Sequence, residues 1–256
     1  MRKFLVVLTA IMLHTSVKAE HYIVGAQNIS YFPHYAFQSP IDKGLAWAIL
    51  EAYAEKSGHT FDYVALPIVR LRKELVKGNV DIIYPDNPKW FNSQLETDNK
   101  YYSSPLVRAL GGTIVTLDKQ GKGIDAVKRL GLPAGFSPVK WQSRIESKQT
   151  KLIPAEDSLS ALLLLAEQQA DAVDLEYNVA SYLSRNKHKL SNIRLDPSLP
   201  FDDVGFRLAT IKHKRLIDGL NQFLIEEEAL VESLKRRYNI EDPNIVISRL
   251  QRQQQN

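Results

Sequence analysis

The chain has 256 residues, of which 44% are hydrophobic and 24% charged, and its formal net charge is +4. It contains no cysteine, which excludes a disulfide framework and a lipid anchor attached to cysteine. Basic residues alternate with acidic ones along the chain, so the positive charge does not indicate nucleic-acid binding.

The N-terminus follows the pattern of a secretory signal peptide. Two basic residues precede an apolar run at residues 4–13, and the small-residue site VKA follows at residues 17–19. The run is too short to span a bilayer, so we expect cleavage after Ala19 rather than an uncleaved anchor or a buried first helix. No later segment approaches the ~18 consecutive apolar residues of a membrane span, so we expect a soluble periplasmic protein.

Strand and helix patterns alternate through the first part of the chain. Residues 21–26 read as a strand, 44–56 as a helix that ends at Ser57-Gly58, and 61–66 as a second strand. Pro67 opens a helix through Lys77, and the strand VDIIY follows at residues 80–84. This alternation predicts a parallel sheet with helical crossovers.

The second part repeats the alternation less regularly. We expect Asp157 or Ser158 to cap an apolar helix, and Pro138 to precede another. The expected elements are extended chain at 101–115, a helix at 123–129, a loop at 131–138, a helix at 158–169, a strand at 171–175, a helix at 177–185, a strand at 201–210, helices at 213–225 and 228–238, and a disordered tail at 251–256.

Two distant stretches share one pattern. LVKGNVDIIYPDN and LAEQQADAVDLEYN superpose Asp81 on Asp171, and each has a helix, a polar turn, the aspartate and a short apolar strand. Five residues beyond each aspartate lies an acid, Asp86 or Glu176. Ligands of open α/β sheets bind beyond the carboxyl ends of strands, so the pattern suggests two similar lobes that share a cleft. Chance similarity is the alternative.

Six stretches, taken in order, resemble the periplasmic solute-binding proteins of polar amino acid ABC transporters, extracellular solute-binding family 3. They are YFPHYAF, GLAWAILEAYAEKSGHTFDYVALP, LRKELVKGNVDIIY, YYSSPLV, LLLLAEQQADAV and VGFRLATIKHKRLIDGLNQFL. The resemblance implies a two-lobed, type II periplasmic-binding-protein-like α/β fold, with a hinge and a ligand cleft between the lobes. We expect lobe 1 to comprise residues 20–108 and 203–256, and lobe 2 residues 109–202.

The resemblance also implies which residues line the cleft. In lobe 1 the family's aromatic segment matches Tyr31, Phe32, Pro33, His34 and Tyr35, and the turn that holds a ligand's amino group matches Tyr84, Asp86 and Asn87. In lobe 2 the loop and helix start that hold a carboxylate match Gly135, Phe136 and Ser137, for which a helix N-cap is the structural alternative. Glu176 matches an acid that pairs with an ammonium group, and Tyr177 lies beside it.

One departure from the family concerns the carboxylate clamp. The family carries an arginine about a dozen residues after the strand aspartate, whereas this chain has Ser93, with Lys89 and Trp90 nearby. Arg70 could reach the cleft instead, or could be an ordinary surface residue. Because Asp86 and Glu176 are both acidic, we expect a ligand with an ammonium group, such as an amino acid, a small peptide or an amine. Alternatively, Asp86 only forms an Asx turn.

The expected function is therefore solute binding by lobe closure, for delivery to an inner-membrane ABC permease. Two alternatives stay open: a sensing module that docks on a membrane sensor protein, and a dehydratase-like enzyme with Glu176 as general acid. The histidines lack metal-ligand spacing, and no phosphate-binding glycine motif or nucleophile elbow occurs. We expect no metal, no cofactor and no nucleic acid, and a monomer.

Overall fold

The computed structural model describes residues 19–90 and 100–255, and its strands form one continuous sheet. The strands run in the order β2, β1, β3, β10, β5, β8, β6 and β7, while β4 also pairs with β10 and β9 with β5. The strands are β1 (His21–Gln27), β2 (Thr60–Leu66), β3 (Ile82–Asp86), β4 (Tyr101–Tyr102), β5 (Val107–Thr116), β6 (Arg129–Pro133), β7 (Lys151–Ala155), β8 (Ala172–Glu176), β9 (Ile193–Leu195) and β10 (Asp202–Thr210). The helices are α1 (Leu45–Ser57), α2 (Ile68–Lys77), α3 (Gln142–Glu146), α4 (Ser158–Ala166), α5 (Tyr177–Asn186), α6 (Lys214–Glu226), α7 (Glu228–Arg237) and α8 (Pro243–Gln255).

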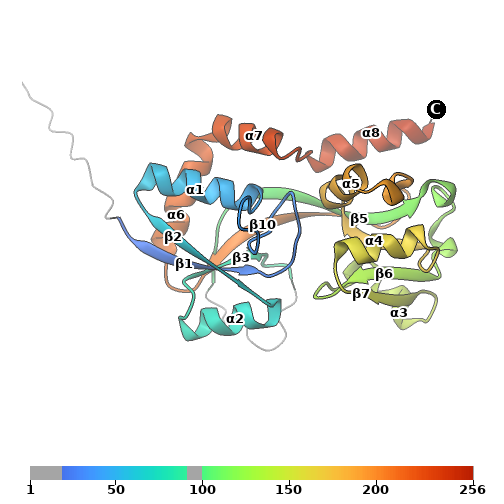
Figure 1. The fold of residues 1–256 in the computed structure, drawn as a ribbon, viewed down its shortest axis with the longest axis horizontal. Helices are drawn as coiled ribbons and strands as arrows, with labels where there is room; N and C mark the ends of the chain where they lie inside the picture. Colours follow the sequence, from blue (N-terminus) through green and yellow to red (C-terminus); the bar gives the residue numbers. More distant parts are fainter. Residues whose placement is uncertain (1–18, 91–99, 256) are drawn as a thin grey trace, which may run out of the picture.

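Figure 1 shows two α/β lobes joined by the long strands β5 and β10. Lobe 1 contains β1 to β3 with α1, α2 and α6, and lobe 2 contains β6 to β8 with α3, α4 and α5. β10 belongs to both lobes, because it pairs with β3 near its end and with β5 over residues 202–206. The two antiparallel strands therefore carry the chain between the lobes.

The expected alternation of lobe 1 is confirmed. β1 lies between β2 and β3 and is parallel to both. α1 ends at Gly58 and α2 at Gly78, and both glycines take the left-handed conformation that ends a helix. In lobe 2 the expected cap of α4 is also confirmed, because the Asp157 carboxylate accepts a hydrogen bond from the Ser160 N–H at 2.7 Å.

The similarity around Asp81 and Asp171 is confirmed in the geometry of the two lobes. The Asp81 carboxylate accepts a hydrogen bond from the Ile23 N–H of β1, and the Asp171 carboxylate accepts one from the Arg129 N–H of β6, both at 2.8 Å. The backbone N–H of each aspartate donates to the carbonyl of the same partner residue. The shared sequence pattern therefore reflects one structural unit that occurs once in each lobe.

The third strand, expected at residues 80–84, does not end before Pro85. β3 continues through Pro85 to Asp86, which lies opposite Arg207 of β10. The register of β3 and β10 shifts between this pair and the Ala209–Ile83 pair. This irregularity accommodates Pro85, which has no N–H to donate. Asp86 is therefore a buried strand residue rather than part of a turn.

The helix expected at residues 123–129 is also wrong. The chain forms one short 3-10 turn at Ile124–Ala126 and then enters β6, which lies between β7 and β8. Gly131 permits this packing, because a Cβ there would lie 2.9 Å from the Val173 side chain of β8. β7 and β9 were not anticipated. Their short sequences become strands because neighbouring strands supply the pairing.

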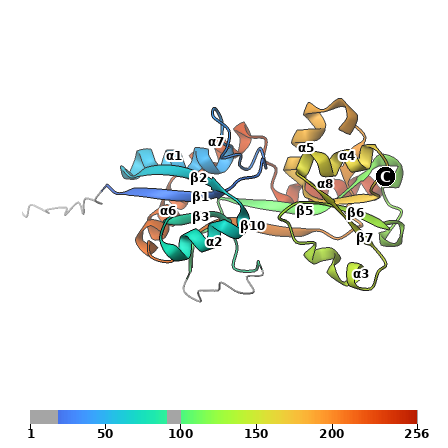
Figure 2. The ribbon, with the colours of Figure 1, turned by 60° about the horizontal axis from the view of Figure 1, so that its bottom comes forward.

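The C-terminal tail was expected to be disordered, but residues 251–255 form the last turns of α8. This helix leaves lobe 1 after α7 and lies beside α5 of lobe 2 (Figures 1 and 2). Val246 anchors it and is fully buried. The glutamine-rich tail, exposed at residues 251–253, continues the helix that the earlier, packed residues begin.

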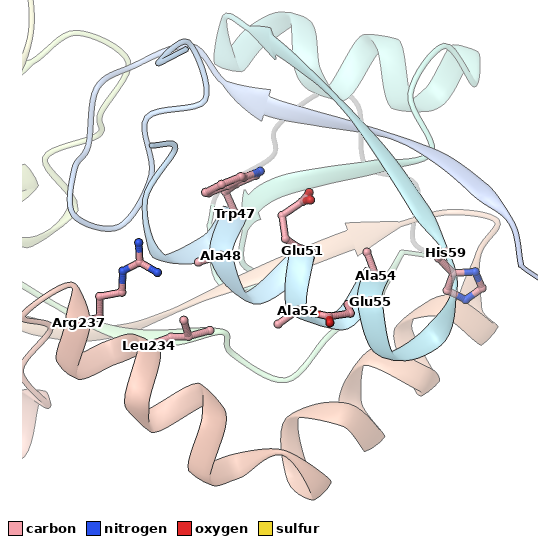
Figure 3. A pocket seen from close by; sticks show the side chains of 9 residues that line it. All are labelled: Trp47, Ala48, Glu51, Ala52, Ala54, Glu55, His59, Leu234 and Arg237. Carbon is pink, nitrogen blue, oxygen red and sulfur yellow. The ribbon is translucent and has the colours of Figure 1, made fainter. Parts of the chain in front are cut away.

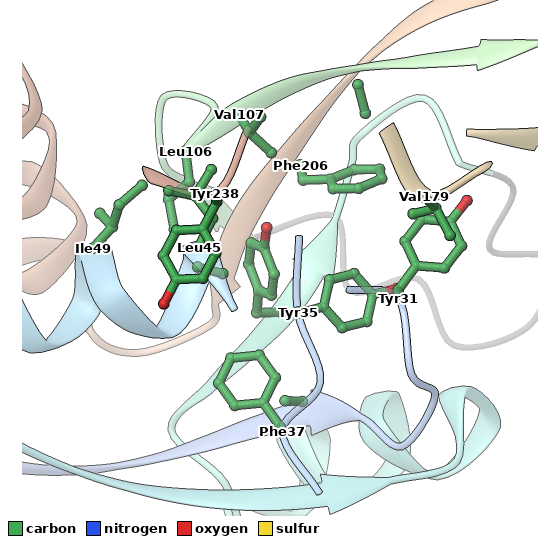
Figure 4. Packing of buried hydrophobic residues seen from close by; sticks show 14 of the residues in the cluster. Tyr31, Tyr35, Phe37, Leu45, Ile49, Leu106, Val107, Val179, Phe206 and Tyr238 are labelled. Carbon is green, nitrogen blue, oxygen red and sulfur yellow. The ribbon is translucent and has the colours of Figure 1, made fainter. Parts of the chain in front are cut away.

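One hydrophobic core runs through both lobes and their junction. It contains Leu45 and Ile49 of α1, Phe206 of β10 and Val179 of α5, and Tyr31 and Tyr35 lie among them (Figure 4). Among the described helices, none combines the length and the apolar character needed to cross a bilayer. The expected signal peptide lies, apart from Ala19, outside the described residues.

Candidate functional site

The candidate site is the junction where the loop between β1 and α1 meets lobe 2. Tyr31 and Tyr35 form an isolated β-bridge within this loop, and the Tyr31 N–H donates to the Tyr35 carbonyl at 2.8 Å. The tight loop buries both tyrosines and His34.

Tyr31 stacks on Phe136 from the loop after β6, with ring centroids 5.2 Å apart and planes 27° apart. Its ring centroid also lies 6.3 Å from that of Phe206 of β10. Burial, and next the charge of Glu176, raise the pKa of Tyr31 well above its usual value, so the hydroxyl stays protonated. Tyr31, an expected ligand residue, thus takes part in an aromatic contact between the two lobes.

His34 and Glu176 form the polar centre of the junction. His34 Nε2 lies 2.9 Å from Glu176 Oε2, and both side chains are almost completely buried. The contact does not have hydrogen-bond geometry, so neither ring nitrogen of His34 has a hydrogen-bond partner in the described part of the chain. An unsatisfied buried polar group costs about 1–3 kcal/mol, so the ring is suited to accept a new polar partner.

Glu176 is also the N-cap of α5. Its Oε2 accepts a hydrogen bond from the Val179 N–H at 2.8 Å, and its Oε1 accepts one from the Asn178 amide at 3.0 Å. These bonds fix the carboxylate in position. A ligand ammonium group would therefore reach Glu176 by replacing His34 rather than by filling an empty site.

Asp86 and Asn87 are bound by other groups of lobe 1. Asp86 Oδ2 lies 2.9 Å from Lys100 Nζ, and only 2% and 6% of the two side chains are exposed. Asn87 donates to the Gly205 carbonyl and accepts from the Lys89 N–H two residues on, which is an Asx turn. The Asx turn, which was the alternative considered for Asp86, therefore forms at Asn87, and the charge of Asp86 is balanced within the protein.

The structure does not bring Asp86 and Glu176 together. Asp86 lies opposite Arg207 of β10, whereas Glu176 lies opposite Gly111, which itself lies opposite Asp202. At the usual rise of about 3.3 Å per residue, positions 202 and 207 are separated by roughly 16 Å along β10. This arrangement does not favour one cation shared by both acids.

Tyr84 and Trp90, both expected ligand residues, belong to the lobe 1 side of the junction. Tyr84 is fully buried, its ring lies 5.7 Å from Tyr35, and its hydroxyl has no hydrogen-bond partner among residues 19–90 and 100–255. Burial raises its pKa far above the usual value. The Trp90 ring lies 6.0 Å from Phe206. Ser93, where the family places arginine, falls outside the described residues.

The loop expected to hold a carboxylate is exposed at Gly135 and Ser137. Ser137 does not cap a helix, because a 3-10 turn begins after Pro138 and α3 is only five residues long. The helix start expected here is therefore too short to provide a strong anion site. The loop does approach α2, since a Cβ on Gly135 would lie 3.7 Å from Ile68.

Arg70, Phe32 and Tyr177 lie outside the buried centre. Arg70 is exposed in the first turn of α2. The ring centroid of Phe32 lies 4.7 Å from that of Tyr182 of α5. The Tyr177 hydroxyl donates to Glu241 at 3.0 Å and accepts from Arg249 of α8 at 2.8 Å, so it is already engaged.

Three features of the junction were not anticipated from sequence. Phe206 lies at its centre, Lys100 neutralises Asp86, and Lys140 lies between Asp174 and Asp202, at 2.9 and 3.0 Å. Burial raises the pKa of Asp174; burial alone would lower that of Lys140, but the two carboxylates raise it. No sequence signal links these partners; Lys140 and Asp202, for example, are 62 residues apart. No cluster of three metal-ligating side chains occurs in the described chain.

Two pockets lie outside the buried contact between His34 and Glu176. The larger, about 540 Å³, lies between α1 and α7 and is lined by Trp47, Glu51, Glu55 and Leu234 among others (Figure 3). The second, about 220 Å³, lies between the loop before α1 and the ends of α5 and α7. Neither was predicted, because each is formed by segments that are distant in sequence.

No protein-family model matches the chain. No curated protein sequence matches it either. Solved structures do match over most of its length, and all three described next are less than 25% identical to it.

An arginine transport periplasmic binding protein from Legionella pneumophila is 19% identical, with a TM-score of 0.65 over 86% of this chain and 100% of that one. An ancestral arginine-binding protein bound to arginine is 14% identical, with a TM-score of 0.69 over 85% and 97%. A histidine kinase sensor domain similar to periplasmic binding proteins is 15% identical, with a TM-score of 0.66 over 85% and 95%. The chain thus has a two-lobed, type II periplasmic-binding-protein-like α/β fold.

Proposed function

We propose that this protein binds a small polar solute between its two lobes and holds it by lobe closure. The observation that carries the proposal is the contact of His34 and Tyr31 with Glu176 and Phe136, which belong to different lobes. Such contacts can open when two lobes joined by two strands move apart. The fold shared with amino acid binding proteins supports this proposal.

The proposed ligand carries an ammonium group and is an amino acid or another amine. On binding, the ammonium group takes the place of His34 beside the Glu176 carboxylate, which α5 holds in a fixed orientation. Tyr31 and Phe136 then pack on the rest of the ligand. A ligand that binds the closed form better shifts the population toward closure.

The closed form would be recognised by a membrane protein. We propose delivery to an inner-membrane ABC permease by a monomer, secreted to the periplasm after cleavage at Ala19, with the lobe boundaries expected from the sequence. Likeness to sensor domains favours a second candidate, in which the closed form signals to a membrane sensor. An enzyme has less support, since both oxygens of Glu176 already accept hydrogen bonds.

A thermal-shift screen of the protein tests the proposal. The panel contains amino acids, amines, small peptides, organic acids and sugars. A ligand at a hundred times its dissociation constant adds about 2.7 kcal/mol of stability. We expect a rise in melting temperature with at least one amine or amino acid, and its loss in Glu176→Gln, which removes the charge but keeps a capping oxygen.

Asp157→Asn, at the N-cap of α4, is the matched control and keeps the response. Hits confined to neutral or anionic solutes, unchanged in Glu176→Gln, contradict the ammonium ligand but leave solute binding intact. The absence of any hit contradicts solute binding, and consumption of a hit compound supports the enzyme.

A further inference from the structure

The smaller pocket straddles the two lobes beside the candidate site. Its volume is about 220 Å³, and its walls include three aromatic rings, two guanidinium groups and one carboxylate. They belong to Phe32, Tyr182, Tyr238, Arg185, Arg237 and Asp42. α5 of lobe 2 contributes Tyr182 and Arg185, while the other side chains come from the loop before α1 and the end of α7.

The aromatic rings close one wall of the pocket. Phe32 lies 4.7 Å from Tyr182 and 5.9 Å from Tyr238, measured between ring centroids. Because Phe32 and Tyr182 belong to different lobes, this wall exists only while the lobes are together. A molecule bound here would therefore contact both lobes.

The pocket carries an excess of positive charge. Neither Arg185 nor Arg237 makes a hydrogen bond or ion pair with another residue in the described ranges, although the charge of Arg185 interacts with that of Glu241 and Arg237 lies 5.7 Å from the centroid of the Tyr238 ring. Asp42, by contrast, accepts hydrogen bonds from the Gly44 N–H at 2.9 Å and the Tyr238 hydroxyl at 2.7 Å. Burial and the bond to Asp42 raise the pKa of Tyr238 to about 12, so this hydroxyl remains a donor.

The two arginines could simply offset the negative ends of their helices, since both lie in a last turn. The end of α7, however, is already satisfied by other groups. The Leu234, Lys235 and Arg236 carbonyls at the end of α7 accept the N–H groups of the residues that follow. In α5, the Asn186 amide donates to the Tyr182 carbonyl at 2.8 Å. Arg237 is therefore not needed to satisfy its helix end, and in the described ranges neither guanidinium group makes a hydrogen bond that a ligand would have to replace.

We propose that this pocket binds a small oxyanion with at least two negative charges, held between Arg185 and Arg237. Guanidinium groups bind carboxylate and phosphate oxygens in pairs, and the aromatic wall accommodates an organic body. Such an anion would join α5 to α7 and so favour the closed lobes. The site lies outside the Glu176 contact, and the proposal does not depend on the function proposed above.

The test is the melting temperature of the protein titrated with sodium phosphate or sodium citrate, with sodium chloride holding the ionic strength constant. We expect a saturable rise with one or both anions; which of them acts distinguishes an inorganic from an organic oxyanion. Arg185→Gln and Arg237→Gln should each weaken the apparent affinity at least about tenfold, because each removes charge-assisted hydrogen bonds.

Arg236→Gln is the matched control, because Arg236 is exposed in the same last turn and carries the same charge but does not line the pocket. Phosphate and citrate also stabilise proteins without binding, through exclusion from the surface. A rise that does not saturate, or one that is equal in all three variants, would overturn the proposal. Loss of the response in only one of the two pocket variants would overturn the bridging geometry.

Discussion

Asp86 shows how a residue that suits a ligand can instead serve the fold. It ends a buried strand, and its carboxylate is 2.9 Å from the Lys100 ammonium group in a site that excludes water. A buried carboxylate costs several kcal/mol unless a partner compensates it. The ion pair is therefore required locally, whatever the ligand is.

We predict that Lys100→Met destabilises the protein by about 3–5 kcal/mol, because it leaves the Asp86 charge buried and unpaired. Urea denaturation at neutral pH measures the change. The double variant Asp86→Asn with Lys100→Met should regain most of the loss, since it removes both charges.

Lys77→Met is the surface control, because the Lys77 side chain is 62% exposed beside Glu74 and its loss should change little. Equal stability of Lys100→Met and the natural protein would show that Asp86 is not paired in solution and is available to a ligand.

At the scale of elements, each lobe contains the same unit: a helix, an aspartate and a strand whose neighbour donates a backbone N–H to that aspartate. Asp171 also contacts Lys119 at 2.8 Å and Arg129 at 2.9 Å. Partial burial alone would raise its pKa, but the hydrogen bonds and charges of these partners lower it far below the usual range. The aspartate therefore fastens the start of β8 to β6.

We predict that Asp171→Asn lowers the melting temperature at neutral pH and that this difference shrinks as the pH falls below about 4. The sign follows from the lowered pKa of the folded state: the carboxylate stabilises the fold above the unfolded pKa of about 3.9, and this contribution is lost on acidification. Melting curves between pH 7 and pH 2 measure it. Asp125→Asn, which removes a carboxylate that is 87% exposed, is the control. A difference that is constant with pH would refute the linkage.

At the scale of the whole molecule, a few side-chain contacts at the junction hold the two lobes together. Tyr31 on Phe136, Phe32 on Tyr182 and His34 beside Glu176 all join lobe 1 to lobe 2. β5 and β10 form the backbone connection, and Glu241, just before α8, and Arg249 of α8 both form hydrogen bonds with the Tyr177 hydroxyl of lobe 2. The balance between open and closed lobes thus depends on a few side chains.

We predict that Phe136→Ala shifts this balance toward the open form, by up to about tenfold, because an aromatic pair contributes about 0.5–1.5 kcal/mol beyond its buried area. The chain has no cysteine, so spin labels on Lys73→Cys in lobe 1 and Glu146→Cys in lobe 2 are specific. Pulsed electron spin resonance should show a larger population at the longer distance in the variant.

Phe61→Ala is the control for the loss of an aromatic ring, because Phe61 stacks on Tyr53 within lobe 1. It should leave the distance distribution unchanged. A distribution that Phe136→Ala also leaves unchanged would mean that the Tyr31 stack does not hold the lobes together.

The sequence by itself determined most of the local elements of lobe 1 and the type of fold. Periodicity and the stop signals at Gly58 and Gly78 located the helices of lobe 1, and the pattern around Asp81 and Asp171 revealed the repeated unit. These features depend on residues that are close in sequence, where spacing alone fixes which side chains share a face.

Only the tertiary structure decided which strands pair and which charges meet. β6 forms a strand because β7 and β8 flank it, and α8 forms because its packed residues contact lobe 2. The Asp86 carboxylate is paired with the Lys100 ammonium group, so its charge is not available to a ligand. Likewise, the Glu176 carboxylate lies beside the His34 ring only because the two lobes are closed on each other. Pairing and burial join residues that are distant in the chain, and no local pattern encodes those partners.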